Sequence, residues 1–522
     1  MRSGRRSAGV ASPRRPLLAR ALDLIERIGN ALPNPATLFL IMAAIVLVAS
    51  AVTASLGVTV PHPKDGSPIV PVNLLTRDGL RRIFTEAVRN FTGFAPLGTV
   101  LVAMLGIGVA EATGLIGAAM RAFVMAMPRG LLTAAVVFTG VNANQAADAG
   151  IIILPPLGAL LFAAAGRHPL AGLAAAYAGV SGGFSANLLP STLDVLLAGF
   201  TQEAVSASKL LPGYHVSMLG NWWFMAAATP LLTVAGTWVT HRFVEPRLGA
   251  WKGETHAPLE RLSPEERRGL IAAGIAALLT VLGFLALVMP GWGPLRTEGA
   301  TTLDRLKPFF DSMVILVLLG FFVPGLAYGL AVGKIRSDHD VVRITSDTVS
   351  TMAGYIVLAF CCAQFVSYFA WSNLGSIVAI TGAKTLQGFG LEGATLLIGF
   401  VLFAAGMNLL ITSSSAMWAI IGPIFVPMFA LLGFTPEGTQ AVYRIGESAT
   451  NIVTPLLPYM PFVLAAVQRY DKKAGTGTLI TLMVPYAVVY LIAWTALLLV
   501  FYTLGWDIGP GVGMRLAQPL TP

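Results

Sequence analysis

The stretch YRIGESATNIVTP, residues 443–455, places Arg444 and Glu447 in sequence that is otherwise apolar enough for a membrane. Upstream, residues 393–436 contain no Asp, Glu, Lys or Arg, and the next charged residue after Glu447 is Arg469. Charged side chains are costly at membrane depth, and those that occur there mark sites of function. The stretch is therefore the first candidate for a functional site.

The composition is that of a polytopic membrane protein. Of the 522 residues, 55% are hydrophobic and 11% are charged, and the mean hydropathy is +0.75, whereas soluble domains carry about 25% charged residues. The net charge of +9 comes from basic residues that flank apolar runs, which is a topology signal and argues against a nucleic-acid partner. Cys361 and Cys362 lie in an apolar run and indicate core packing. HExxH, Walker and CxxC motifs are absent, so we predict neither an enzyme nor a metal site or cofactor.

The charge pattern divides the chain into two membrane halves. The Arg-rich residues 1–30 predict a cytoplasmic tail, because basic flanks stay inside. We expect a first half at 31–240, a cytoplasmic linker at 241–268, a second half at 269–506 and a short external tail at 507–522. A span needs about 20 apolar residues, so the pattern predicts an all-α protein of about nine spans. The clearest single runs are 36–60, 95–120, 216–240, 269–291, 312–333, 348–373 and 476–505, with an external loop at 61–94.

Each half also contains a long apolar stretch that polar residues interrupt near its middle. Residues 130–166 are interrupted by GVNANQAADAG (140–150), and residues 393–436 by NLLITSSSA (408–416). Irregular backbone is tolerated at membrane depth only where protein or a water-filled cavity surrounds it. We therefore predict two re-entrant hairpins with polar tips.

The two halves share a spacing. Each hairpin is followed by a Gly-rich break, GGFSANLLP at 182–190 and GESATNIVTP within the opening stretch. In both halves an Asn of the hairpin tip lies 43 residues before an Asn of the break. These pairs are Asn144 with Asn187, and Asn408 with Asn451. Because one hairpin enters from inside and the other from outside, this pattern is an inverted repeat, typical of secondary transporters with a midplane site. The alternative is chance recurrence of Gly, Asn, Ser and Pro.

Two interpretations of Arg444 and Glu447 stay open. They can form an i,i+3 ion pair that neutralises itself. Alternatively, Arg444 offers its planar fork to a substrate carboxylate, while Glu447 balances the empty site or carries a proton. The helix break beside them would supply free backbone N–H and C=O groups for a substrate or a cation.

Three further acids lie at predicted membrane depth. Asp194 follows the first break and is either solvated at an outer mouth or part of the site. Asp148 either caps a hairpin helix or meets a ligand. Glu111 either relays protons or makes a neutral hydrogen bond.

Hydroxyl and amide oxygens at the tips and breaks are able to bind Na⁺ as well as a polar substrate. The alternative for the serines is local bonding to backbone. Trp418, one turn beyond the second tip, either stacks on an aromatic substrate or packs in the core. The candidates for ion coupling are Asn144, Asp148, Asn187, Ser413, Ser414 and Asn451.

Five segments resemble the p-aminobenzoyl-glutamate transporter (AbgT) family, in the family's order and across nearly the whole chain. They are NALPNPATLFL (30–40), GRHPLAGLAAAYAGVSGGFSANLL (166–189), AQFVSYFAWSNLG (363–375), SSSAMWAIIGPIFVPM (413–428) and YRIGESATNIVTPLLPY (443–459). The resemblance implies a multi-pass secondary transporter of the bacterial inner membrane, within the ion transporter superfamily. It also implies a bowl-shaped homodimer whose protomers each have nine spans and two hairpins.

The resemblance further implies a substrate and a site. Family members are associated with uptake of p-aminobenzoyl-glutamate, and some with export of sulfonamide drugs, so the direction of transport and the choice between H⁺ and Na⁺ stay open. Glu447 stands where the family commonly has Asp in RIGDS, and the tip NANQAADAG departs from the usual form. The expected substrate-binding residues are Asp194, Asn408, Ser415, Trp418, Arg444 and Pro455, together with Glu447.

Overall fold

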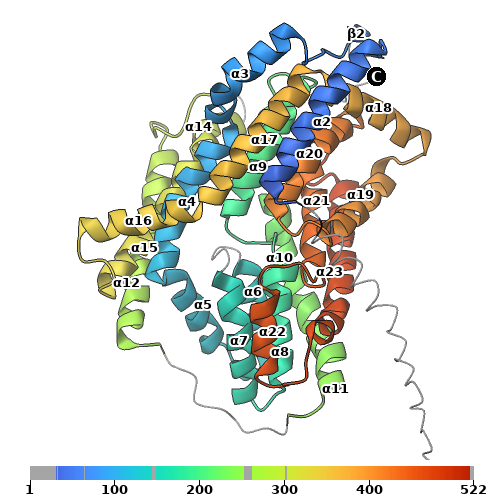
Figure 1. The fold of residues 1–522 in the computed structure, drawn as a ribbon. Helices are drawn as coiled ribbons and strands as arrows, with labels where there is room; N and C mark the ends of the chain where they lie inside the picture. Colours follow the sequence, from blue (N-terminus) through green and yellow to red (C-terminus); the bar gives the residue numbers. More distant parts are fainter. Residues whose placement is uncertain are drawn as a thin grey trace, which may run out of the picture.

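The computed structural model describes residues 31, 33–63, 65–143, 149–251, 262–299 and 302–517, almost entirely as helices (Figure 1). Among these residues, seven helices are long and apolar enough to cross a membrane, or up to nine if each bent pair is one span. The predicted class, an all-α polytopic protein with about nine spans and two hairpins in an inverted repeat, is confirmed. The predicted tail 1–30 lies outside the described residues, as do parts of the linker and of the last segment.

The first half follows its apolar runs, with shorter elements between them. Its elements are α2 (Pro35–Ser55), β1 (Val60–Pro61), β2 (Pro68–Ile69), α3 (Arg77–Thr92), α4 (Ala95–Thr113), α5 (Leu115–Ala126), η1 (Arg129–Leu131), α6 (Leu132–Asn142), α7 (Ala149–Ala164), α8 (Pro169–Tyr177), the π-helix η3 (Ala178–Gly182), α9 (Thr192–Ser208), α10 (Trp222–Val239), the π-helix η4 (Thr240–Val244) and α11 (Glu245–Leu248). The stretch 61–94 was predicted to be a loop, which is wrong, because it contains α3 and the antiparallel pair β1–β2. The Thr76 hydroxyl caps α3 by accepting the Gly79 N–H, so a helix forms in polar sequence.

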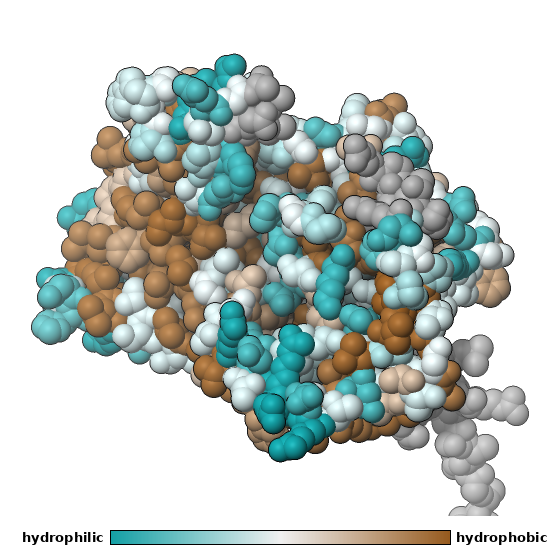
Figure 2. All heavy atoms as spheres, turned by 90° about the horizontal axis from the view of Figure 1, so that it is seen from above, coloured by the Kyte–Doolittle hydropathy of each residue, from teal (hydrophilic) through white to brown (hydrophobic). Residues whose placement is uncertain are grey.

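The second half has the same mixture of long and short helices. Its elements are α12 (Pro264–Val288), α13 (Thr302–Arg305), α14 (Lys307–Asp311), α15 (Met313–Ala331), α16 (Asp338–Thr351), α17 (Ala353–Trp371), α18 (Leu374–Gly388), α19 (Gly393–Asn408), α20 (Ser414–Leu431), α21 (Pro436–Thr450), α22 (Met460–Gln468) and α23 (Thr476–Leu504). Large apolar side chains stay exposed along spans of both halves, for example Ile45 at 60% and Leu279 at 62%. Seen from above, the molecule has a broad hydrophobic surface on its left flank (Figure 2), as expected of a surface that faces lipid.

Each hairpin has two helices, the first of which follows a sharp bend. α6 and α7 form the first hairpin, and the helix before it, α5, is bent by 119° to the segment that contains α6. α19 and α20 form the second, and α18 is bent by 116° to α19. Gly390 and Gly393 at the second bend have φ angles of +68° and +54°, a region that disfavours side chains.

The helix that follows each break packs on a hairpin helix of the other half. α9, which follows the first break, packs on the hairpin helix α20 of the second half, and α22, which follows the second break, packs on the hairpin helix α7 of the first half. Within the second half, α21 also approaches the backbone of α19 closely, since a Cβ on Gly446 would lie 2.3 Å from the Val401 carbonyl oxygen. The crossing brings both breaks to the centre of the molecule, where the candidate site lies.

Candidate functional site

The helix α21 carries Arg444 and Glu447 through the centre of the molecule. It begins at a proline, which suits a helical first turn, and the Thr435 hydroxyl caps it by accepting the Gly438 N–H. Residues 436–449 are all buried. Polar groups on so enclosed a helix have to be satisfied by other protein groups or by ligands.

Arg444 pairs with an acid from the other half of the chain. Its Nη2 lies 2.6 Å from Oδ1 of Asp194, and both side chains are buried. The described residues show no ion pair between Arg444 and Glu447, so the i,i+3 alternative is wrong, as is the solvated alternative for Asp194. The physical reason is the crossing described above, which places the start of α9 against α21.

The Asp194 carboxylate is held by more than the arginine. Its Oδ2 accepts the Ser191 N–H at 2.6 Å, the Ser191 hydroxyl at 2.9 Å and the Asn187 Nδ2 at 3.1 Å. It also sits in the first turn of α9, where the positive end of the helix dipole favours an anion. Asp194 is therefore well solvated by protein even without Arg444.

The Arg444 guanidinium is held less completely. Besides the bond to Asp194, its Nη2 donates to the Ser185 carbonyl oxygen at 3.2 Å. Its Nε has no hydrogen-bond partner among the described residues, although the atom is buried. A buried donor without a partner is costly, so a ligand oxygen at Nε would be stabilised by this site.

Glu447 contacts neutral donors. Its Oε2 accepts the hydroxyl of Ser448 at 2.9 Å and that of Ser185 at 3.4 Å, and its Oε1 accepts the Asn451 Nδ2 at 3.1 Å. The Ser185 N–H in turn donates to the Ser448 hydroxyl at 3.1 Å. Glu447 thus joins the two breaks through hydroxyls and an amide, a setting in which it is able to exchange a proton or meet a cation.

The two Asn residues of the second half meet, as their spacing suggests. Asn408 Nδ2 donates to the Asn451 Oδ1 at 2.9 Å and to the Glu447 carbonyl oxygen at 2.8 Å. Three buried oxygens near the tips and breaks lack a partner among the described residues, namely Asn187 Oδ1, Asn408 Oδ1 and Ser414 Oγ. Such acceptors are able to bind a cation or a donor on a ligand.

The first hairpin tip is described only in part. Asn144 and Asp148 lie outside the described residues, so their expected roles stay predictions. Asn142, two residues before, accepts the Leu188 N–H at 3.1 Å, which links the first hairpin to the first break.

The second hairpin tip holds the predicted serines and tryptophan. Ser413 caps α20 by accepting the Ala416 N–H, and the Ser414 carbonyl oxygen accepts the Tyr443 hydroxyl at 2.6 Å. Trp418 is fully buried, with its ring 4.6 Å from that of Tyr443 and its Nε1 donating to Thr201 at 2.9 Å. Its stacking on a substrate stays a prediction.

The other predicted residues lie nearer the edge of this centre or away from it. Ser415 and Pro455 are half-buried, and Glu111 is half-buried on α4, which packs on α9, α15 and α16. Two functional candidates could not be singled out from the sequence, Ser185 in the first break and Ser448 in the last turn of α21.

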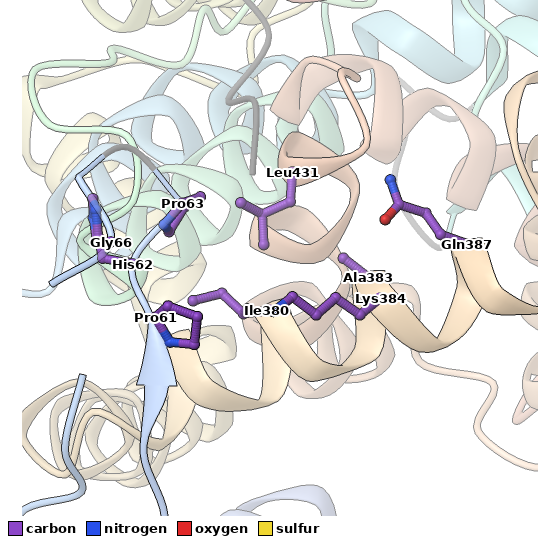
Figure 3. A pocket seen from close by; sticks show the side chains of 9 residues that line it. All are labelled: Pro61, His62, Pro63, Gly66, Ile380, Ala383, Lys384, Gln387 and Leu431. Atoms are coloured by element: carbon purple, nitrogen blue, oxygen red, sulfur yellow. The ribbon is translucent and has the colours of Figure 1, made fainter. Parts of the chain in front are cut away.

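Three cavities, of about 310, 600 and 480 Å³, lie away from the charged centre. The first is formed where the loop after β1 meets α18 and the end of α20, with Lys384 and Gln387 among its lining residues (Figure 3). None of the predicted site residues that the structure describes lines these three cavities. Asp194, Arg444 and Glu447 are themselves buried.

The chain is similar to known membrane transport proteins over nearly its whole length. Residues 20–516 match the model of the "AbgT putative transporter family". The chain is 41% identical over 493 residues to the p-aminobenzoyl-glutamate transport protein of Escherichia coli (strain K12), covering 94% of this chain and 96% of that protein.

Two solved structures have the same fold. The YdaH transporter of Alcanivorax borkumensis is 41% identical with a TM-score of 0.87, covering 92% of this chain and 100% of that one. MtrF of Neisseria gonorrhoeae, which is described with a class of antimetabolite efflux pumps, is 44% identical with a TM-score of 0.88, covering 94% of this chain and 100% of that one.

Proposed function

This chain belongs to the AbgT transporter family, and from that premise we propose that it is a secondary active transporter of p-aminobenzoyl-glutamate or a related aromatic anion. Two broken helices that meet a buried charge pair at the centre of an inverted repeat are the layout of such transporters. The similarity to the Escherichia coli transport protein supports the choice of substrate.

The observation that carries the proposal is the buried and incompletely bonded Arg444 guanidinium. A planar guanidinium binds a carboxylate through two parallel hydrogen bonds. Here Nη2 is shared between Asp194 and Ser185, while Nε has no partner among the described residues. In the proposed mechanism a substrate carboxylate bonds to Nε and competes with Asp194 for Nη2. Asp194 then relaxes onto its three remaining donors.

Coupling to an ion is proposed at the same centre. Glu447 is able to carry a proton, because its oxygens contact hydroxyl and amide groups that tolerate either protonation state. The unpartnered oxygens of Asn187, Asn408 and Ser414 are candidates to bind Na⁺, which prefers hard oxygen ligands. Asn451, whose Oδ1 accepts from Asn408, completes that group.

Export of sulfonamide antimetabolites is the second candidate function. It is supported by the similarity to MtrF over 94% of this chain. A sulfonamide shares an aromatic ring and an acidic group with p-aminobenzoyl-glutamate, so one arginine site would serve both.

The proposed setting is the bacterial inner membrane. Residues 1–30 and the linker 241–268 would lie on the cytoplasmic side and 507–522 outside, following the positive-inside rule. Two copies would form a homodimer. Reagents that label only one face of the membrane would test this orientation at cysteines placed in 241–251 and 505–517.

Transport in proteoliposomes tests the function. Vesicles that contain the purified protein are given labelled p-aminobenzoyl-glutamate or a labelled sulfonamide, with Na⁺ and pH gradients imposed separately. The proposal expects accumulation that collapses with one of the gradients and is lost in Arg444→Ala. Lack of transport of either compound under every gradient would refute it.

A further inference from the structure

The cavity of about 600 Å³ lies beyond the end of α23, next to the start of α21. Its volume is within the range of about 300–1,000 Å³ that small-molecule sites occupy. The proposed topology places the end of α23 and the start of α21 at the outer face of the membrane. Its polar lining residues include Tyr214, Thr435, Tyr502, Asp507 and Arg515, and Leu504, Val512 and Met514 are among its apolar ones.

Arg515 is the cation of this cavity. Its Nη2 donates to the Tyr502 hydroxyl at 2.7 Å, and its guanidinium carbon lies 4.5 Å from the centre of the Tyr502 ring. Among the described residues it forms no ion pair with a carboxylate, although Asp507 lines the same cavity. The ring fixes one face of the guanidinium and leaves other N–H groups for an anion.

The backbone around Arg515 is fixed in place. Arg515 pairs as an antiparallel bridge with Phe434, and the Leu516 N–H donates to the Gly433 carbonyl oxygen at 2.9 Å. Thr435 bonds to the same segment through its N–H, at 3.1 Å from the Met514 carbonyl oxygen, and through its hydroxyl. The arginine is therefore presented by a pre-organised segment rather than by a free tail.

The cavity is also joined to the helix of the charged centre. Tyr214, in its wall, donates its hydroxyl to Oε2 of Glu437 at 2.7 Å. Glu437 is buried in the first turn of α21, the helix that carries Arg444 two turns further on. The cavity thus lies at the outer end of the same helix.

We propose that this cavity is a second, outer binding site that captures aromatic carboxylates before they reach the Arg444 centre. The carboxylate would bind Arg515, the apolar part would lie along Leu504, Val512 and Met514, and an amine or amide N–H would donate to Asp507. This inference rests on the proposed function for its substrate class, but its binding test does not require transport.

The transport test compares Arg515→Ala with the wild type in vesicles of known orientation, with p-aminobenzoyl-glutamate as the probe. A charge-assisted hydrogen bond is worth roughly tenfold or more in affinity, so the KM for uptake from the outer face should rise by about that factor with the maximal rate kept. Transport from the inner face should be unchanged. Arg515→Lys, which keeps the charge but lacks the fork, should fall between the two. Arg77→Ala, which removes an exposed positive charge from α3, is the matched control.

The capture site would be overturned by an unchanged KM in Arg515→Ala or by the same rise of KM in Arg77→Ala. It would also be overturned if Arg515→Ala lowered the transport rate equally from both faces. A binding measurement separates this outcome from failure of the proposed function. Purified Arg444→Ala protein should still bind p-aminobenzoyl-glutamate, and Arg444→Ala with Arg515→Ala should not. If the single variant binds none, or if the double variant binds as well as the single one, the inference is wrong whether or not the wild type transports.

Discussion

The pair of Arg444 and Asp194 should respond unequally to the loss of either partner. Asp194→Asn leaves a buried guanidinium without its paired negative charge, with the Ser185 carbonyl oxygen at 3.2 Å as its other acceptor. Arg444→Met, of similar length, leaves a carboxylate that keeps three donors from Ser191 and Asn187. Removing one partner of a buried ion pair costs about 3–5 kcal/mol when the other charge is left uncompensated.

We therefore expect Asp194→Asn to lose about 3–5 kcal/mol of folding free energy. Arg444→Met should lose less, about 1–3 kcal/mol, because its partner stays hydrogen-bonded. The double variant should be more stable than Asp194→Asn alone, since no uncompensated charge remains. All three should fail to transport.

The assay is a double-mutant cycle of unfolding free energies in detergent micelles, beside transport in proteoliposomes. The cycle isolates the coupling between the two residues. Additive losses, with a coupling energy near zero, would refute the reasoning. So would a larger loss in Arg444→Met than in Asp194→Asn, because the order rests on the different numbers of remaining hydrogen bonds.

The remaining predictions concern packing and the cytoplasmic side of the proposed topology. Gly446→Ala should destabilise the protein by about 1–3 kcal/mol through overpacking, since its Cβ would lie 2.3 Å from the Val401 carbonyl oxygen; an unchanged melting temperature would contradict this. Arg167→Ala should cost about 2 kcal/mol, because Arg167 bonds to Glu245 at 2.7 Å after the first hairpin; Arg129→Ala, outside this contact, should cost less. Burial raises the pKa of Glu245, but the hydrogen bonds and charges of Arg167 and His241 together outweigh it and lower that pKa. The ionised Glu245 therefore stabilises the fold above the ordinary glutamate pKa of about 4.3, and this stabilisation is lost as the pH falls through the lowered pKa of Glu245. The melting temperature measured against pH should lose this acid step in Glu245→Gln, and an identical profile in the variant would contradict the prediction.

The hairpins could be predicted closely from the sequence. The expected limits 130–166 and 393–436 contain α6 with α7 and α19 with α20. Long uncharged runs with a polar interruption have few other solutions in a membrane. The same reasoning found the first break, because Gly-rich polar sequence does not sustain a buried helix. The predicted second break began too early, since α21 continues through Gly446 to Thr450 and the chain leaves the helix only at Asn451.

The partner of Arg444 could not be predicted in the same way. Local spacing favours Glu447, one turn away, whereas the observed partner Asp194 is 250 residues distant in sequence. That contact depends on how α9 crosses to α20, which is decided by tertiary packing. The short helices α5 and α18 were also missed. The predicted run 95–120 merged part of α5 with α4, and α18 fell between the predicted segments 348–373 and 393–436.

The role of Arg444 in coupled transport is tested by accumulation of p-aminobenzoyl-glutamate in proteoliposomes, with wild type and Arg444→Ala compared under separate Na⁺ and pH gradients. We expect the wild type to concentrate the compound above its external level under one gradient, and folded, correctly inserted Arg444→Ala not to do so. Equal accumulation by the two proteins would contradict it, as would a wild type that moves the compound only down its own gradient.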